Sequence, residues 1–219
     1  MKVNDQEFKS KLEKIKVSCK DVSILLSPEH FDNGNLKGSC ELKNIMFLGL
    51  NRSHPEENDL CYHNMREALD FLIKKEDLKS YIEGSYLSDF IKGEKIIDDW
   101  QKVKIKFSKE KEVSKAITDS GNKDEIVKKC CETLFEEISQ FNIKIVFCWG
   151  WKSYGLIRKC LNVRPREEKP LLDKQRSFIY DNKYFIYLKH YSRAVRGPKE
   201  KNESIIIEQI KTGLRPLDK

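Results

Sequence analysis

Residues 45–53, with the sequence IMFLGLNRS, constrain the fold of this chain more than any other stretch. The run from Ile45 to Leu50 is apolar apart from one glycine, is too short for a helix and ends where the chain becomes polar. Such a run is typical of a buried, parallel strand that leads into a loop at its carboxyl edge. In open α/β sheets, ligands bind in the crevice beyond that edge.

The residues at the end of this strand are compatible with a binding site or with a plain exit loop. Gly49 permits a close approach of the backbone or an unusual φ angle, and Asn51 places an amide just past the strand. An ordinary core strand, after which Asn51 only caps the next segment, accounts for the stretch equally well.

Hydrophobic periodicity predicts that helices and strands alternate along the chain. Apolar residues recur at helical spacing in segments at residues 5–17, about 64–81, about 122–141, 150–160 and 205–210, the last closed by Gly213 and Pro216. Short apolar runs predict strands at residues 84–90 and 143–150 and a hairpin formed by residues 177–180 and 184–189. This alternation predicts an α/β fold, a three-layer sandwich with a central, mostly parallel sheet of about four strands flanked by helices.

A chain of 219 residues is long enough for one domain with a sizeable core. We expect a single domain over residues 1–219, in which residues 1–41 form an N-terminal helix and a lead-in of loop composition. Residues 93–124 are rich in Lys and Glu and poorly periodic, which indicates a charged insertion.

Composition excludes some classes of protein and leaves others open. The net charge of +7 is compatible with a polyanionic partner without identifying one. No apolar run approaches the roughly 20 residues of a membrane span, and the N-terminus does not resemble a signal peptide. The seven cysteines lack paired metal-ligand spacing, so we expect reduced thiols in a cytoplasmic protein without a metal or an iron–sulfur cluster.

Polar residues or a glycine follow each of the main predicted strands. Asn51 follows the first, Ser88 and Asp89 end the second, Gly150 opens a helix after the third, and His190 and Ser192 follow the hairpin. The tryptophans on either side of Gly150, Trp149 and Trp151, are interpreted as core and surface packing.

Four landmarks in this order resemble the uracil-DNA glycosylase superfamily. They are Gly49-Leu50-Asn51, Tyr86-Leu87-Ser88-Asp89, the strand from Val146 to Gly150 with its helix, and His190-Tyr191-Ser192. The resemblance covers roughly residues 42–212 and leaves the N-terminal helix and the insertion unaccounted for.

The resemblance implies a monomeric DNA glycosylase that needs no cofactor. Asn51 would orient the attacking water, and His190 would donate a hydrogen bond to a carbonyl oxygen of the departing base. Arg193 and Arg196 would contact phosphates or fill the space left by the flipped nucleotide, and Tyr62 would stack on the base. The further expected substrate or DNA contacts are Gly49, Leu50, Arg52, Gly84, Ser88, Asp89, Tyr191 and Ser192.

Three positions depart from the pattern of the superfamily. Arg52 and Tyr191 stand where many relatives have Pro, and Gly84 stands where uracil-specific members carry an Asn that reads the base. A glycine at that position leaves volume for a bulkier pyrimidine, so the expected substrate is uracil or a modified pyrimidine, including hypermodified bases of phage DNA. The alternatives are a non-catalytic nucleic-acid-binding protein on the same fold and a nucleotide-handling α/β enzyme that does not act on DNA.

Overall fold

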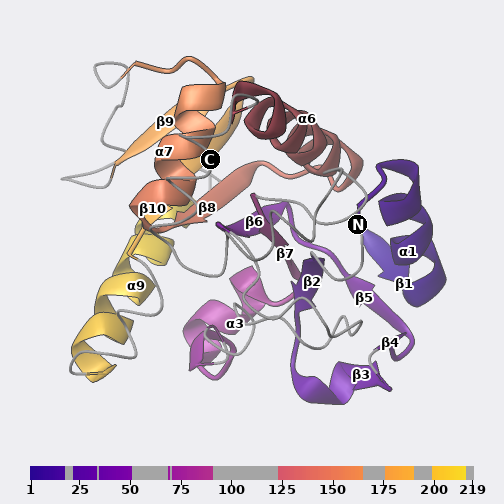
Figure 1. Ribbon diagram of the computed structural model, residues 1–219. Coiled ribbons are helices and arrows are strands. Elements are labelled where there is room, and N and C mark those ends of the chain that lie inside the picture. The colour runs from indigo at the N-terminus through magenta and orange to yellow at the C-terminus, as the bar shows by residue number, and fades with distance from the viewer. Residues whose placement is uncertain are drawn as a thin grey trace.

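The computed structural model describes residues 1–17, 22–33, 35–50, 69, 71–90, 123–164, 176–189 and 199–215. These residues form an α/β fold in which a mixed, six-stranded sheet is flanked by helices (Figure 1). In spatial order its strands are β2 (Val22–Leu25), β7 (Ser85–Asp89), β6 (Ile45–Gly49), β8 (Ile145–Trp149), β10 (Lys183–Leu188) and β9 (Ser177–Tyr180). Strands β7, β6, β8 and β10 run parallel, while β2 and β9 lie antiparallel at the two edges.

The sheet has six strands where the sequence predicted about four, because both strands of the predicted hairpin join it and because β2 was not foreseen. Its four residues are all buried, yet Ser23 interrupts the apolar run and weakens the strand signal. The lead-in is also more ordered than its loop composition indicates. It contains a short 3₁₀ helix and two small antiparallel sheets: η2 (Pro28–His30), β3 (Phe31–Asp32) paired with β4 (Asn35–Leu36), and β1 (Lys2–Asn4) paired with β5 (Ser39–Glu41).

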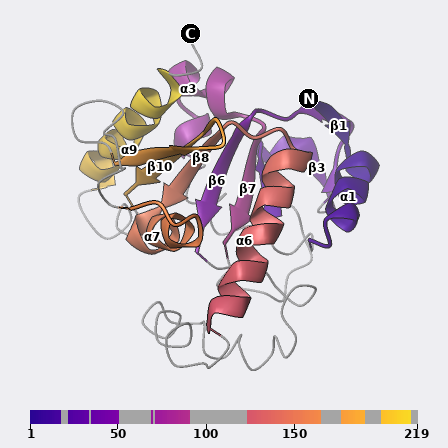
Figure 2. The ribbon, with the colours of Figure 1, turned by 90° about the horizontal axis from the view of Figure 1, so that it is seen from above.

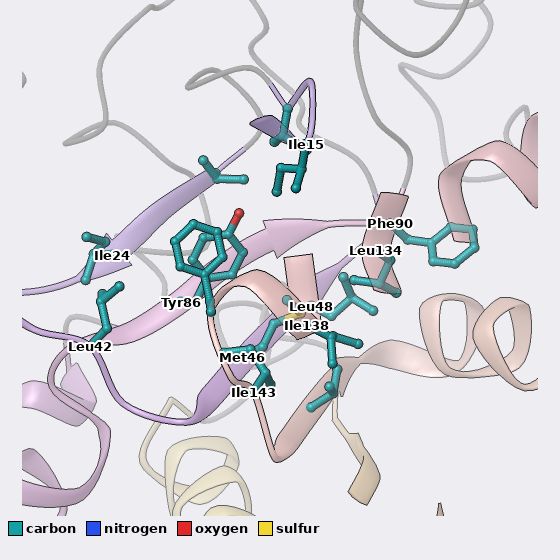
Figure 3. Packing of buried hydrophobic residues seen from close by; sticks show 14 of the residues in the cluster. Ile15, Ile24, Leu42, Met46, Leu48, Tyr86, Phe90, Leu134, Ile138 and Ile143 are labelled. Atoms are coloured by element: carbon teal, nitrogen blue, oxygen red, sulfur yellow. The ribbon is translucent and has the colours of Figure 1, made fainter. Parts of the chain in front are cut away.

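One face of the sheet packs against α1 (Asp5–Lys14), α6 (Lys123–Gln140) and α7 (Gly150–Cys160). The predicted helix at residues 5–17 is confirmed, and Asn4 begins it with a reciprocal capping box to Glu7. Figure 3 shows the core of this face, where Leu134 and Ile138 of α6 meet Met46 and Leu48 of β6 beside Tyr86 of β7.

The opposite face packs against α3 (Glu76–Ile82) and α9 (Lys199–Leu214), which lie below the sheet in Figure 1. The prediction of one helix from about 64 to 81 is wrong at its carboxyl end. Residues 71–73 are helical, but Lys75 has an extended backbone, and α3 begins anew at Glu76. Leu78 and Ile82 lie four residues apart on one face of α3, and both pack in the core on this side of the sheet.

The sequence predicted that Gly213 closes the last helix. In the structure, Gly213 lies within α9. A Cβ atom at this position would lie 2.5 Å from Cε1 of Phe147 and 2.8 Å from Cδ1 of Ile186. The glycine therefore lets α9 approach the sheet closely, and a larger residue here would have to displace the Phe147 ring or the Ile186 side chain. None of the helices in the described ranges is long and apolar enough to cross a membrane.

Candidate functional site

The candidate site is the edge at which the four parallel strands end, which we call the carboxyl edge. Gly49 of β6 pairs with Asp89 of β7, and Trp149 of β8 pairs with Leu188 of β10, so all four strands end at about one level. Figure 2 shows the arrowheads of β6 and β7 pointing to the same end of the sheet. The described part of this edge consists of Leu50, Asp89, Phe90, the start of α7 and Lys189.

The two residues expected to perform the chemistry, Asn51 and His190, lie outside the described residues. The strands that precede these two residues are described. β6 ends at Gly49, β10 ends at Leu188, and only β8 lies between these two strands. The ends of β6 and β10 are thus two strand spacings apart, which amounts to about 10 Å. The other expected site residues outside the described ranges are Arg52, Tyr62, Tyr191, Ser192, Arg193 and Arg196.

The turn before β10 explains how the chain reaches this edge. Asp181 and Asn182 both have positive φ angles, 49° and 56°, as a two-residue hairpin turn requires. The predicted hairpin is confirmed: β9 and β10 pair antiparallel, with Lys183 opposite Tyr180. β10 then runs parallel to β8 and delivers Lys189 to the carboxyl edge.

Gly84 does not lie at the carboxyl edge, in contrast to the other described site residues. It precedes β7 at the opposite, amino edge, has a φ angle of +89°, and donates a hydrogen bond of 2.8 Å to the Leu25 carbonyl oxygen. A Cβ atom there would lie 2.0 Å from the Glu41 carbonyl oxygen. The volume that the sequence attributed to a base pocket is thus filled by backbone, and Gly84 serves the fold.

Ser88 and Asp89 lie at the end of β7 and point to opposite faces of the sheet. Asp89 is only 3% exposed, and the β6–β7 ladder continues past it, because the Phe90 amide donates to the Gly49 carbonyl oxygen at 3.1 Å. The Ser88 hydroxyl points beneath α6, where it donates to Oε1 of Glu137 at 2.9 Å. Ser88 therefore anchors a helix from the strand that ends at the candidate site.

Glu137 is a buried polar residue that the sequence interpretation missed. Its Oε1 also accepts a hydrogen bond of 2.8 Å from the Tyr86 hydroxyl, so Glu137 links α6 to two residues of β7. The side chain is fully buried within an otherwise apolar layer. A signal existed: Glu137 falls three residues after Leu134 and four before Phe141, on the apolar stripe of the predicted helix.

The third landmark, at the junction of β8 and α7, is confirmed in its local structure. Gly150 has a φ angle of +76°, which lets the chain pass from the strand directly into the helix. Ser153 stabilises the first turn by donating to the Trp149 carbonyl oxygen at 2.5 Å. Trp149 is buried against Phe47, with 6.0 Å between ring centroids, whereas Trp151 is half exposed.

The described cysteines lie in or beside the core and do not form a metal centre. A hydrogen bond between the thiols of Cys131 in α6 and Cys160 in α7 lowers the pKa of Cys131, against burial, and raises the pKa of Cys160. Burial alone raises the pKa of Cys148. Within the described ranges, no group of three or more His, Cys, Asp or Glu side chains is arranged to hold a metal ion.

Comparison with known proteins leaves the chain without a family assignment. No family model matches the sequence, and no curated protein matches it.

Proposed function

We propose that this protein is a DNA glycosylase that removes uracil or a modified pyrimidine from DNA and leaves an abasic site. The observation that supports this most is the shared edge of β6 and β10, since the two residues that follow these strands, Asn51 and His190, are those that the chemistry needs. We also propose that the three-layer arrangement belongs to the type found in uracil-DNA glycosylases.

The reaction explains why an amide and an imidazole would be placed together. The enzyme must flip the nucleotide out of the stack, because the glycosidic bond is otherwise out of reach. As that bond breaks, positive charge develops on the sugar and negative charge on the departing base. In the proposal, His190 donates to the base oxygen that gains charge, and the Asn51 amide holds the water that attacks the sugar. Because an amide does not accept a proton outright, leaving-group stabilisation provides most of the catalysis.

The remaining proposed contacts surround this pair. Arg193 and Arg196 follow His190 in the sequence, and we propose that their guanidinium groups bind phosphates. Tyr62 would stack on the flipped base, and Leu50 and Asp89, at the ends of β6 and β7, would border the pocket. In this proposal the protein acts as a cytoplasmic monomer without a cofactor.

The identity of the base is left to experiment. Since Gly84 lies at the amino edge, it neither reads the base nor provides room for it. A suitable panel therefore contains uracil and modified pyrimidines in single- and double-stranded oligonucleotides, together with hypermodified phage genomic DNA.

Incubation with this panel, followed by cleavage of abasic sites with alkali, tests the proposal. We expect strand breaks at one class of base, in the presence or absence of a metal chelator. The His190→Ala and Asn51→Ala variants are the matched controls, since contaminating glycosylase activity would survive in both preparations. DNA binding without abasic sites on any substrate would instead favour the non-catalytic nucleic-acid-binding protein.

A further inference from the structure

A half-exposed tryptophan lies at the start of α7 in a cluster of aromatic and cationic side chains. The guanidinium carbon of Arg176 lies 4.4 Å from the centroid of the Trp151 ring, and the ring of Tyr187 lies 5.0 Å from it. Tyr154, one turn further along α7, stacks at 5.9 Å. We call Trp151, Tyr154, Arg176 and Tyr187 the Trp151 cluster.

The Trp151 cluster borders the carboxyl edge of the sheet. Trp151 is the second residue of α7, directly after the end of β8. Arg176 precedes β9, and its carbonyl oxygen accepts a hydrogen bond of 2.9 Å from the amide of Tyr187, next to the last residue of β10. His190 follows Tyr187 by three residues in sequence.

Trp149 and Trp151 differ in their exposure. Trp149 is 1% exposed and packs into the core against Phe47, whereas Trp151 is 50% exposed. Contacts with Tyr154, Tyr187 and the Arg176 guanidinium restrain the Trp151 ring and leave half of the side chain exposed. An aromatic side chain that is already held in place loses little conformational entropy when a flat ligand stacks on it.

Among the described residues of the Trp151 cluster and the first turn of α7, the charged side chains are cationic, which suits an anionic ligand. Arg176 places a cation over the indole, and the first turn of α7, which is described throughout, contains Lys152 and no acidic residue. The amino end of a helix adds partial positive charge at the same place. An aromatic surface bordered by cations fits a nucleobase and its phosphate, because bases stack on indole and guanidinium planes alike.

We propose that the Trp151 cluster is a stacking platform for an unpaired base of single-stranded DNA, with the adjoining phosphate held by Arg176. The choice of DNA rests on the proposed glycosylase function, and the platform extends it, because it would hold a neighbour of the nucleotide that enters the pocket. It also replaces the interpretation of Trp151 as simple surface packing.

Fluorescence anisotropy of a labelled, pyrimidine-rich single-stranded oligonucleotide tests the platform without any need for catalysis. Loss of one stacked base should weaken binding by about 5- to 150-fold in Trp151→Ala. Trp151→Phe, which keeps an aromatic ring, should recover most of the affinity. The matched control is Tyr180→Ala, which removes a 40% exposed aromatic ring from the far end of β9, and it should bind like the wild type.

Tryptophan fluorescence separates a direct contact from a structural effect. A base stacked on Trp151 should quench part of the emission of the wild type, and this quenching should disappear in Trp151→Phe although DNA still binds. Circular dichroism and thermal melting identify variants that fail to fold.

Normal affinity in a folded Trp151→Ala variant would overturn the platform, as would a wild-type protein that does not bind single-stranded DNA. The proposed function is judged separately by the appearance of abasic sites. Affinity that depends on Trp151, without excision, would support the platform and contradict the glycosylase. Excision together with an affinity that does not depend on Trp151 would support the glycosylase and contradict the platform.

Discussion

The two edges of the sheet are built in different ways. At the amino edge, backbone groups bond to backbone groups: the amide of Lys43 donates to the carbonyl oxygen of Gly84 at 3.0 Å, and that of Lys144 donates to the carbonyl oxygen of Asn44 at 2.8 Å. The described part of the carboxyl edge also has a backbone bond, from the Phe90 amide to the Gly49 carbonyl oxygen at 3.1 Å, but it differs in carrying the half-exposed Trp151, whose ring lies against Arg176.

We expect the amino edge to support the fold and the carboxyl edge to bind ligands. Backbone hydrogen bonds at the amino edge fix the starts of the strands with little dependence on side-chain type, apart from the glycine that a close contact requires. At the carboxyl edge, the half-exposed side chain of Trp151 can still contact a ligand. Substitutions at the amino edge should therefore change stability, and substitutions at the carboxyl edge should change binding or catalysis.

The sharpest test at the carboxyl edge is His190→Ala. Loss of the donor to the departing base should reduce the single-turnover rate of excision by about 10²–10³, as for other donors that stabilise a developing anion. The melting temperature should change little, since the residue is not expected to pack in the core. A normal rate would move the chemistry to other residues, and a large loss of stability would remove the distinction between the edges.

Asn51→Ala separates binding from chemistry at the same edge. The variant should turn over more slowly while its affinity for substrate DNA is nearly unchanged, because the water that Asn51 orients is needed only in the reaction. Equilibrium binding and single-turnover excision, measured on the same oligonucleotide, provide the comparison. Weaker binding at an unchanged rate would make Asn51 a contact residue instead.

At the amino edge, the corresponding substitution is Gly84→Ala. A Cβ atom 2.0 Å from the Glu41 carbonyl oxygen, on a backbone with a φ angle of +89°, should lower the free energy of unfolding by about 3 kcal/mol. Gly38→Ala is the control, because Gly38 has a φ angle of +77° but open space around it, and only about 1–2 kcal/mol of backbone strain is expected. Equal losses in urea denaturation would show that the close contact relaxes easily.

Tyr86→Phe tests the hydrogen bond between β7, which runs from the amino edge to the carboxyl edge, and α6. Its hydroxyl donates to buried Glu137, and removal of such a hydrogen bond costs about 1–3 kcal/mol. Tyr180→Phe, which removes a more exposed hydroxyl, should stay within about 0.5 kcal/mol of the wild type. Similar effects in the two variants would mean that water replaces the Tyr86 hydroxyl without cost.

The smallest effect is expected from the exposed ion pair between Asp77 of α3 and Lys211 of α9. A hydrogen bond from Lys211 lowers the pKa of Asp77 in the folded protein. The pair therefore stabilises the fold above about pH 4, the ordinary pKa of Asp, and this stabilisation is lost as the pH falls through the lowered value.

Melting curves of the wild type and Asp77→Asn should accordingly differ slightly at neutral pH and converge in acid. Lys211→Gln should behave in the same way, and the double variant should show no additional loss. A difference that persists in acid would assign the effect to packing.

The sequence by itself determined the elements whose signals are local. The run at residues 45–50 and the apolar run before Gly150 became β6 and β8, and the periodicity at about 122–141 became α6, because burial on two faces or on one stripe leaves a mark in the pattern. The shared edge of β6 and β10 also followed, since strands in a parallel sheet end together. The residues beyond those ends, Asn51 and His190, stay a prediction.

Only the tertiary structure decided the roles that depend on distant neighbours. Gly84 and Gly213 are glycines because the Glu41 carbonyl and the Phe147 ring come close to them, and neither contact is encoded nearby in the chain. Glu137 is compatible with the core because β7 supplies two hydroxyl groups to it. A periodic pattern records which side of an element is buried, but the identity of the atoms on that side is set by the packing of elements far apart in sequence.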